Sequence, residues 1–183
     1  ASTNDGGTIA NNYVARIEDA SRLQTAIAAA RAQCDFVIAT MHAGTEYTRT
    51  PNEAQKKFAH AAIDDGADLV IGAHPHWVQT VEQYQGKYIF YSLGNFIFDQ
   101  NWSQDTREGL VLKIQITKPK AQNPAAPGAA MSEDLQGQRT PAKLQSIELL
   151  PIIIDNSFPR SATPEETKQI LDKINETQTT LYP

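Results

Sequence analysis

Residues 35–42 read Asp-Phe-Val-Ile-Ala-Thr-Met-His, and residues 68–76 read Asp-Leu-Val-Ile-Gly-Ala-His-Pro-His. Each stretch contains a continuous apolar run with β-branched residues, a pattern typical of a strand that is buried on both faces of a parallel sheet. Both runs begin after an aspartate and lead directly to histidine. The sequence therefore predicts two similar buried strands, each delivering imidazole at its carboxyl end.

A helix is predicted to connect the two strands. Thr50 can cap it, Pro51 suits the first helical position, Glu53 completes a capping box, and Gly66 can end the helix. We therefore expect a helix over about residues 52–65. With the two strands it makes a strand-helix-strand unit, which requires a right-handed crossover.

The other elements are predicted from periodicity and capping signals. A helix ending near Gln33 carries an apolar stripe, and a last helix follows a second capping signal at Thr163. Strands are expected over 78–84 and 87–93, as an antiparallel pair, over 109–117, half exposed, and over 143–154. The stretch 118–142, rich in Pro, Ala, Gly, Ser and Gln, lacks an apolar face and is predicted to be a flexible insertion.

The composition is that of an ordinary globular domain. The 183 residues are 40% hydrophobic and 20% charged, with a formal net charge of -5, so we expect neither nucleic acid nor an anionic membrane as a general partner. The single cysteine, Cys34, allows no internal disulfide and is expected to be packed. The apolar stretch 149–154 is too short to cross a bilayer, which takes about 20 residues. The chain starts at Ala1 without a signal-peptide pattern, which favours a processed product or a fragment.

Three histidines follow the two predicted strands: His42 after the first, and His74 and His76 after the second. The carboxyl ends of parallel strands meet at one edge of a sheet, where ligands and catalytic groups gather. Imidazole suits zinc, iron or manganese, and three such groups can hold a metal ion while leaving positions for water. The alternative is that they are surface or hydrogen-bonded loop histidines. The unusual His-Pro-His sequence and the matching His42 favour the metal site.

Several other polar residues have more than one interpretation. Glu46 could be a further ligand, a partner that orients an imidazole, a general base or a solvated carboxylate. Asn95 lies in a segment that either floors a substrate pocket or forms a turn in which the amide bonds its own backbone. Arg49 could contact an anion or merely be solvated, and His60 is expected on the exposed side of its helix.

Residues 41–47 (Met-His-Ala-Gly-Thr-Glu-Tyr), 72–76 (Gly-Ala-His-Pro-His) and 92–96 (Ser-Leu-Gly-Asn-Phe) together resemble the bacterial CapA family, which is associated with poly-γ-glutamate capsule biosynthesis. That family looks like a branch of the calcineurin-like metallophosphoesterases. The resemblance implies part of a four-layer α/β/β/α sandwich with mixed sheets and metals bound at strand ends. It also implies that a divalent ion (Mn, Fe or Zn) is bound by three residues of this chain: His42, His74 and His76.

The sequence departs from the family pattern in two places. Ala43 stands where the family usually carries Trp. The family's N-terminal motifs, an early acidic metal site and an Asn-Asn-His segment, are not found, and we take Asn11-Asn12-Tyr13 to be a chance similarity. The resemblance therefore implies that residues 1–183 are the C-terminal portion of one domain. Its N-terminal half, on the same or a separate chain, would supply the other ligands of a two-metal site.

Two functions fit these observations. The first is a metal-dependent hydrolase acting on a phosphoester or an acidic polymer, in which Glu46 and Asn95 orient the water or the substrate. The second is a non-catalytic component of a capsule assembly or export complex, including a membrane-bound one. Both imply a location outside the cytoplasm or at the cell surface, with membrane association through segments outside this chain. Whether the chain is an enzyme is left open by its sequence.

Overall fold

The computed structural model describes residues 16–118, 141–176 and 178–183. The helices are α1 (Ala20–Arg31), α2 (Glu53–Asp64), α3 (Gln104–Arg107) and α4 (Pro164–Lys173). The strands are β1 (Ile38–His42), β2 (Leu69–Ala73), β3 (Val81–Tyr84), β4 (Lys87–Phe90), β5 (Glu108–Thr117), β6 (Lys143–Asp155), β7 (Phe158–Ser161) and β8 (Thr180–Leu181).

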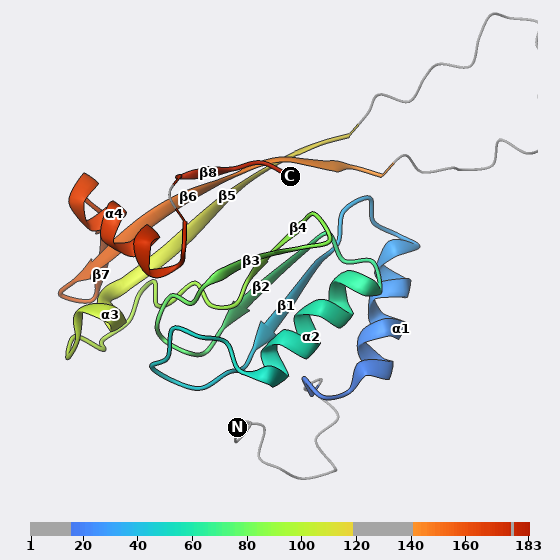
Figure 1. Cartoon of the computed structure of the whole chain (residues 1–183), viewed down its shortest axis with the longest axis horizontal. Coiled ribbons are helices and arrows are strands. Elements are labelled where there is room, and N and C mark those ends of the chain that lie inside the picture. The colour runs from blue at the N-terminus through green and yellow to red at the C-terminus, as the bar shows by residue number, and fades with distance from the viewer. Residues whose placement is uncertain (1–15, 119–140, 177) are drawn as a thin grey trace, which may run out of the picture.

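The first sheet has the strand order β1-β2-β4-β3. β1, β2 and β4 are parallel to one another, and β3 pairs with β4 in antiparallel fashion. The predicted parallel pair and the predicted hairpin are both confirmed. Helices α1 and α2 cover one face of this sheet (Figure 1), and their apolar stripes form one buried cluster with it.

The N-terminus of α2 corrects one sequence prediction. The capping residue is Asn52 rather than Thr50, and its side chain accepts a hydrogen bond from the backbone N–H of Gln55. Gln55 in turn accepts from the backbone N–H of Asn52, so the capping box uses this pair rather than Glu53. The helix begins later than its Thr-Pro signal suggests because Asn52 satisfies the same free donors.

Strand β1 also differs from its prediction, since only one of its faces is buried. Ala39 and Met41 face α1 and α2, whereas the intervening residues Ile38, Thr40 and His42 are exposed. Within the described residues, β1 pairs with β2 alone and forms the edge of the sheet. The apolar run was read as doubly buried, but the second sheet does not cover this strand.

The second sheet is antiparallel and lies on the other side of the first sheet (Figure 1). β5 and β6 form a long pair, while β7 and β8 each add to β6. The alternation over 109–117 predicts that Leu110, Leu112, Ile114 and Ile116 share one face. The first three join the second apolar cluster, whereas Ile116 is 40% exposed. This cluster lies between the sheets and also takes in Leu171 and Ile174 from the end of α4.

These layers confirm the predicted mixed α/β sandwich with two sheets. The expected flexible insertion at 118–142 falls almost entirely outside the described residues, and so does the segment 11–13. Among the helices that the structure describes, none combines the length and the apolar character required to cross a membrane.

Two side-chain predictions are wrong. Cys34 is exposed, because it follows the last turn of α1 and lies outside the packed stripe of that helix. His60 is partly buried: its ring stacks on Tyr84 with a centroid separation of 4.0 Å, and its Nε2 lies 2.9 Å from Glu82 Oε1. The outer side of α2 faces β3 at this point, which the helical periodicity alone does not reveal.

Candidate metal centre

The parallel pairing of β1 and β2 brings two of the candidate ligands together. His42 is the last residue of β1 and lies opposite Ala73, so that His74 follows at the same edge of the sheet. A backbone hydrogen bond from the N–H of Ala43 to the carbonyl of Ala73 continues the pairing beyond the strands. The imidazole centroids of His42 and His74 are 5.1 Å apart. The sequence prediction that these histidines lie close in space is therefore met.

The backbone of the His-Pro-His segment is strained. His74 has φ 103° and His76 has φ 61°, and Tyr47, in the loop after β1, has φ 59°. Positive φ values are uncommon outside glycine, cost about 1–3 kcal/mol each, and cluster at functional sites. The N–H of Tyr47 donates to the carbonyl of Pro75 at 2.8 Å, which joins the two loops. The surrounding structure thus holds both histidines in place.

His76 lies beside His74, with 6.2 Å between the ring centroids, and is oriented by Asn95. The amide Nδ2 of Asn95 donates to the carbonyl of Thr106 at 2.9 Å, which leaves Oδ1 to accept from His76 Nδ1 at 2.8 Å. The proton of the neutral imidazole then sits on Nδ1, and the lone pair of Nε2 is available to a ligand. Asn95 is buried, and its side-chain amide hydrogen-bonds within the protein, to His76 and to Thr106.

The electrostatic surroundings of His74 favour its neutral imidazole form. Burial lowers the pKa of His74 below its ordinary value, and the charges of His42 and His76 lower it further, while Glu46 opposes them. Neutral imidazole is the form that binds metal ions. Glu46 is exposed, and its charge acts on His74. The structure therefore places all of the predicted site residues at one edge of the sheet: His42, Glu46, His74, His76 and Asn95.

The imidazoles are neighbours without being assembled around a common point. In the part of the chain that the structure describes, no group of three or more His, Cys, Asp or Glu side chains is arranged to hold a metal ion. The donor chemistry nevertheless fits a divalent ion, because imidazole nitrogen suits zinc and iron, and His76 presents Nε2. Rotation of the rings would be needed to bring three nitrogens to one ion.

Aromatic residues surround the histidines, and two of them, Trp77 and Trp102, were not singled out from the sequence. Tyr47 lies 6.0 Å from His76 and 4.9 Å from Trp102, measured between ring centroids, and Phe98 lies 5.1 Å from His76. Trp77 lies 6.4 Å from Tyr47. Tyr47 ends the motif 41–47, and Phe98 lies in the Asn95 segment that was read as a possible pocket floor. Trp77 directly follows the motif 72–76, which was its only signal in the sequence.

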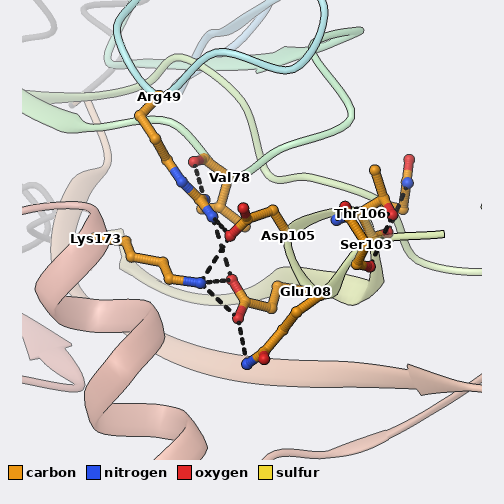
Figure 2. A network of polar contacts seen from close by, with 9 residues as sticks. Arg49, Val78, Ser103, Asp105, Thr106, Glu108 and Lys173 are labelled. Carbon is orange, nitrogen blue, oxygen red and sulfur yellow. Dashed lines mark hydrogen bonds and ion pairs between the residues drawn. The ribbon is translucent and has the colours of Figure 1, made fainter. Parts of the chain in front are cut away.

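A network of charged side chains lies behind these loops (Figure 2). Arg49 donates to the carbonyl of Val78 at 2.7 Å and pairs with Asp105. Lys173 Nζ contacts Asp105 Oδ1 at 2.8 Å and both carboxylate oxygens of Glu108 at 2.7 Å. Arg49 was predicted to contact an anion or to be solvated, and its anions are carboxylates of this chain.

The Glu108 side chain is the best buried member of this charged network, at 1% exposed. The network joins the loops after β1 and β2 to α3, β5 and α4, which are distant in sequence (Figure 2). Arg49 also lies over the ring of Trp77, 5.1 Å from its centroid. The loops that carry the histidines are therefore anchored to the second sheet and to α4.

The fold and the site define a class: an α/β sandwich protein with histidines clustered at the carboxyl edge of its parallel strands. The family model described as "Bacterial capsule synthesis protein PGA_cap" matches residues 2–100, and the chain belongs to this family. The resemblance to the CapA family is thereby confirmed, and the calcineurin-like metallophosphoesterase superfamily is consistent with it.

Curated relatives each match half of the chain or less. The PGA biosynthesis protein CapA of Bacillus subtilis (strain 168) is 42% identical over 92 residues, covering 50% of this chain and 24% of the relative. The capsule biosynthesis protein CapA of Bacillus anthracis is 42% identical over 81 residues, covering 44% and 20%. A probable polyglutamine synthesis accessory protein of Mycobacterium tuberculosis is 35% identical over 65 residues, covering 36% and 17%. The matched region thus spans a quarter or less of these relatives.

Proposed function

We propose that this chain is part of a poly-γ-glutamate capsule biosynthesis protein and carries a metal-dependent, phosphoesterase-like hydrolase site at His42, His74 and His76. The observation that carries the proposal is the proximity of three imidazoles at one sheet edge, with centroid separations of 5.1 Å for His42–His74 and 6.2 Å for His74–His76. The proposed role in capsule biosynthesis is supported by the names of the two Bacillus relatives. Capsule synthesis also favours a location outside the cytoplasm or at the cell surface.

Each residue of the site has a distinct role in this proposal. A bound divalent ion (Mn, Fe or Zn) supplies Lewis acidity toward a phosphoester or an acidic polymer and makes water a better nucleophile. His42, His74 and His76 would hold the ion, His76 through Nε2. Glu46 would accept a proton at its carboxylate from the attacking water. Asn95 would keep the His76 ring in one orientation.

Metal binding tests the proposal directly. The purified chain, incubated with Mn²⁺, Fe²⁺ or Zn²⁺ and freed of excess metal, should retain an ion that the His74→Ala variant loses. His60→Ala is the matched control, since this remaining histidine of the chain stacks on Tyr84 away from the cluster. Equal metal content in the wild type and the His74→Ala variant would contradict the proposal.

The role of Asn95 gives a second, graded test. Asn95→Ala removes the acceptor for His76 Nδ1, so the imidazole can turn and change tautomer. Substitution of such orienting partners typically weakens metal affinity by about 10–100-fold, and that loss is expected here. Asn101→Ala, at an exposed position of the same loop, should leave the affinity unchanged. Metal affinity measured by competition with a chelating dye distinguishes the two variants.

The alternative is a non-catalytic component of capsule assembly or export, including a membrane-bound complex. The observation that favours it is the lack of an assembled metal-binding group among the described residues. Phosphoesterase turnover by a longer form of the protein decides between the two functions. Turnover that is lost in His42→Ala would exclude a purely structural role, whereas undetectable turnover in the metal-loaded protein would exclude the hydrolase.

We further propose that the N-terminal half of a CapA-like domain, on the same or a separate chain, pairs with β1 and completes the site. Support comes from the edge of β1, which no other strand among the described residues pairs with, and from the exposed Ile38, Thr40 and His42 on the face away from the helices. Backbone N–H groups on an unpaired edge exchange quickly with solvent, and an added strand protects them. Hydrogen exchange over 38–42 should therefore slow when that half is added, and unchanged exchange would contradict the pairing.

A further inference from the structure

Apolar side chains are concentrated on the loop between β4 and α3, directly beside the histidines. Four of the large apolar residues that are exposed in the described part of the chain lie within residues 96–102. Two of them reach the site: Phe98 is 38% exposed and lies 5.1 Å from the ring of His76, and Trp102 is 61% exposed and lies 4.9 Å from Tyr47. We call Tyr47, Phe98 and Trp102 the aromatic wall.

The aromatic wall is held in a defined geometry. The ring planes of Tyr47 and Trp102 meet at 79°, so the two rings form a corner. The backbone N–H of Tyr47 donates to the carbonyl of Pro75 at 2.8 Å, and its hydroxyl accepts from Gln100 Nε2 at 3.2 Å. Tyr47 therefore offers a fixed surface, and a bound ring would lose little free energy to ordering the protein.

The charges near the wall do not suit an anionic group. Glu46 follows the same strand as Tyr47 and is exposed, and its charge acts on His74. Arg49, the nearest arginine in sequence, already donates to Val78, Asp105 and Glu108 (Figure 2). A negatively charged leaving group would meet the carboxylate of Glu46, and Arg49 is already paired with carboxylates of this chain. An uncharged, flat group would meet ring faces and edges, which prefer stacked and edge-to-face contacts.

We propose that the aromatic wall binds the leaving group of the substrate and selects a flat, uncharged, apolar group attached to the phosphoryl centre. This inference rests on the proposed hydrolase function and names its substrate class: phosphoesters with an aryl-like leaving group. The three histidines would lie next to the phosphoryl oxygens of the substrate. The aromatic wall would contact the leaving group.

Binding of two phosphonates tests the proposal without requiring turnover. Phenylphosphonate and methylphosphonate carry the same anionic head and differ by the ring. In the presence of Mn²⁺, titration calorimetry should show phenylphosphonate binding about five- to tenfold more tightly, the range expected for one good aromatic contact. Trp102→Ala and Phe98→Ala should each reduce that preference while leaving methylphosphonate affinity unchanged. Tyr182→Ala, an aromatic residue that is 65% exposed outside the wall, is the control.

The possible outcomes distinguish a failure of the aromatic wall from a failure of the hydrolase function. Equal affinity for both phosphonates in the wild type, or a preference that survives in both wall variants, would overturn the role of the wall and leave the hydrolase proposal standing. If neither phosphonate binds the metal-loaded chain, the hydrolase proposal fails, and the substrate class fails with it. Circular dichroism of each variant confirms that the fold is retained, as expected for exposed positions.

Discussion

Gly72 is a position where a single atom decides how closely two strands approach. A Cβ on Gly72 would lie 2.0 Å from the carbonyl oxygen of Tyr91 and 2.9 Å from the side chain of Met41. The first contact is with backbone of the neighbouring segment, which cannot move away cheaply. The absence of a side chain at Gly72 therefore allows β2 to pack closely against the residue that follows β4. The strand ends that carry His74 depend on that contact.

We therefore predict that Gly72→Ala destabilises the chain by at least about 1–3 kcal/mol, the usual cost of overpacking. Gly86→Ala is the comparison, because a Cβ there meets nothing within 4 Å and only the positive φ of 73° opposes it. Its cost should be about 1 kcal/mol. Urea unfolding measures both, and a Gly72→Ala variant as stable as Gly86→Ala would contradict the steric argument.

The candidate ligands could be predicted from sequence because each one follows a strand directly. The apolar runs identified the strands, and parallel pairing then required His42 and His74 to share an edge. The partner of His76 could not be predicted in this way. Asn95 and Trp102 reach the site through loops, whose conformation depends on tertiary contacts rather than on a repeating pattern. The positions of the histidines could thus be predicted from the strands, whereas the residues around them depend on loop conformations that could not be predicted.

At the scale of elements, α4 contributes one lysine to a buried ion pair with β5. Lys173 contacts both carboxylate oxygens of Glu108, whose side chain is 1% exposed. Removing the lysine would leave a buried carboxylate with Arg49 at 3.4 Å and Gln104 at 3.1 Å as its remaining partners. Breaking a buried pair typically costs about 3–5 kcal/mol. Because Lys173 is 31% exposed and other partners remain, we expect about 2–3 kcal/mol for Lys173→Ala.

Lys168→Ala provides the matched control on the same helix. Lys168 pairs with Asp172 four residues later, and its side chain is 76% exposed, so the loss should be below about 0.5 kcal/mol. Chemical unfolding followed by circular dichroism compares the two variants. Adding Glu108→Gln to Lys173→Ala should recover part of the loss, because the uncompensated charge is then removed. No recovery would show that the lysine acts through packing rather than charge.

Glu176, in the segment after α4, has a side-chain carboxyl group whose charged form is disfavoured by burial. Burial raises the pKa of Glu176 above its ordinary value, so the folded state holds its proton to higher pH than the unfolded state. Below the unfolded pKa both states are protonated and nothing is lost. As pH rises above that value, the unfolded state ionises first and stability falls.

Glu176→Gln should therefore raise the thermal unfolding midpoint at pH 7, where the partly buried carboxylate destabilises the wild type. At about pH 3.5, below the ordinary pKa of glutamate, the wild type and the variant should unfold together. Scanning calorimetry across this range makes the comparison. Glu165→Gln, at an exposed position in the first turn of α4, should show no such gain at pH 7. A midpoint for Glu176→Gln at pH 7 that lies at or below that of the wild type would contradict the argument.

For the molecule as a whole, periodicity predicted the strands but not their arrangement in two sheets. The alternation in 109–117 correctly placed Leu110, Leu112 and Ile114 on one face. It could not show that this face packs on the first sheet, because a local alternation does not reveal which distant segments pack together. The same limit explains β1, whose apolar run was read as doubly buried although Ile38, Thr40 and His42 are exposed.

The two sheets share one apolar cluster, so we predict that they unfold as one unit. Leu149 of β6 is 1% exposed and belongs to the cluster that also contains Leu69 and Phe90 of the first sheet. Both tryptophans, Trp77 and Trp102, lie between β2 and α3 and therefore outside the second sheet. Their fluorescence reports on a region that does not contain Leu149.

Leu149→Ala should cost about 2–5 kcal/mol, as for other buried leucines. If the sheets are coupled, the midpoints of tryptophan fluorescence and far-ultraviolet circular dichroism shift together to lower denaturant. Leu150→Ala, at a neighbouring position that is 38% exposed, should shift either midpoint only slightly. A fluorescence transition that stays at its wild-type midpoint while the circular dichroism changes would show that the second sheet unfolds alone. The histidine loops would then keep their structure without it, which the Arg49–Glu108–Lys173 network argues against.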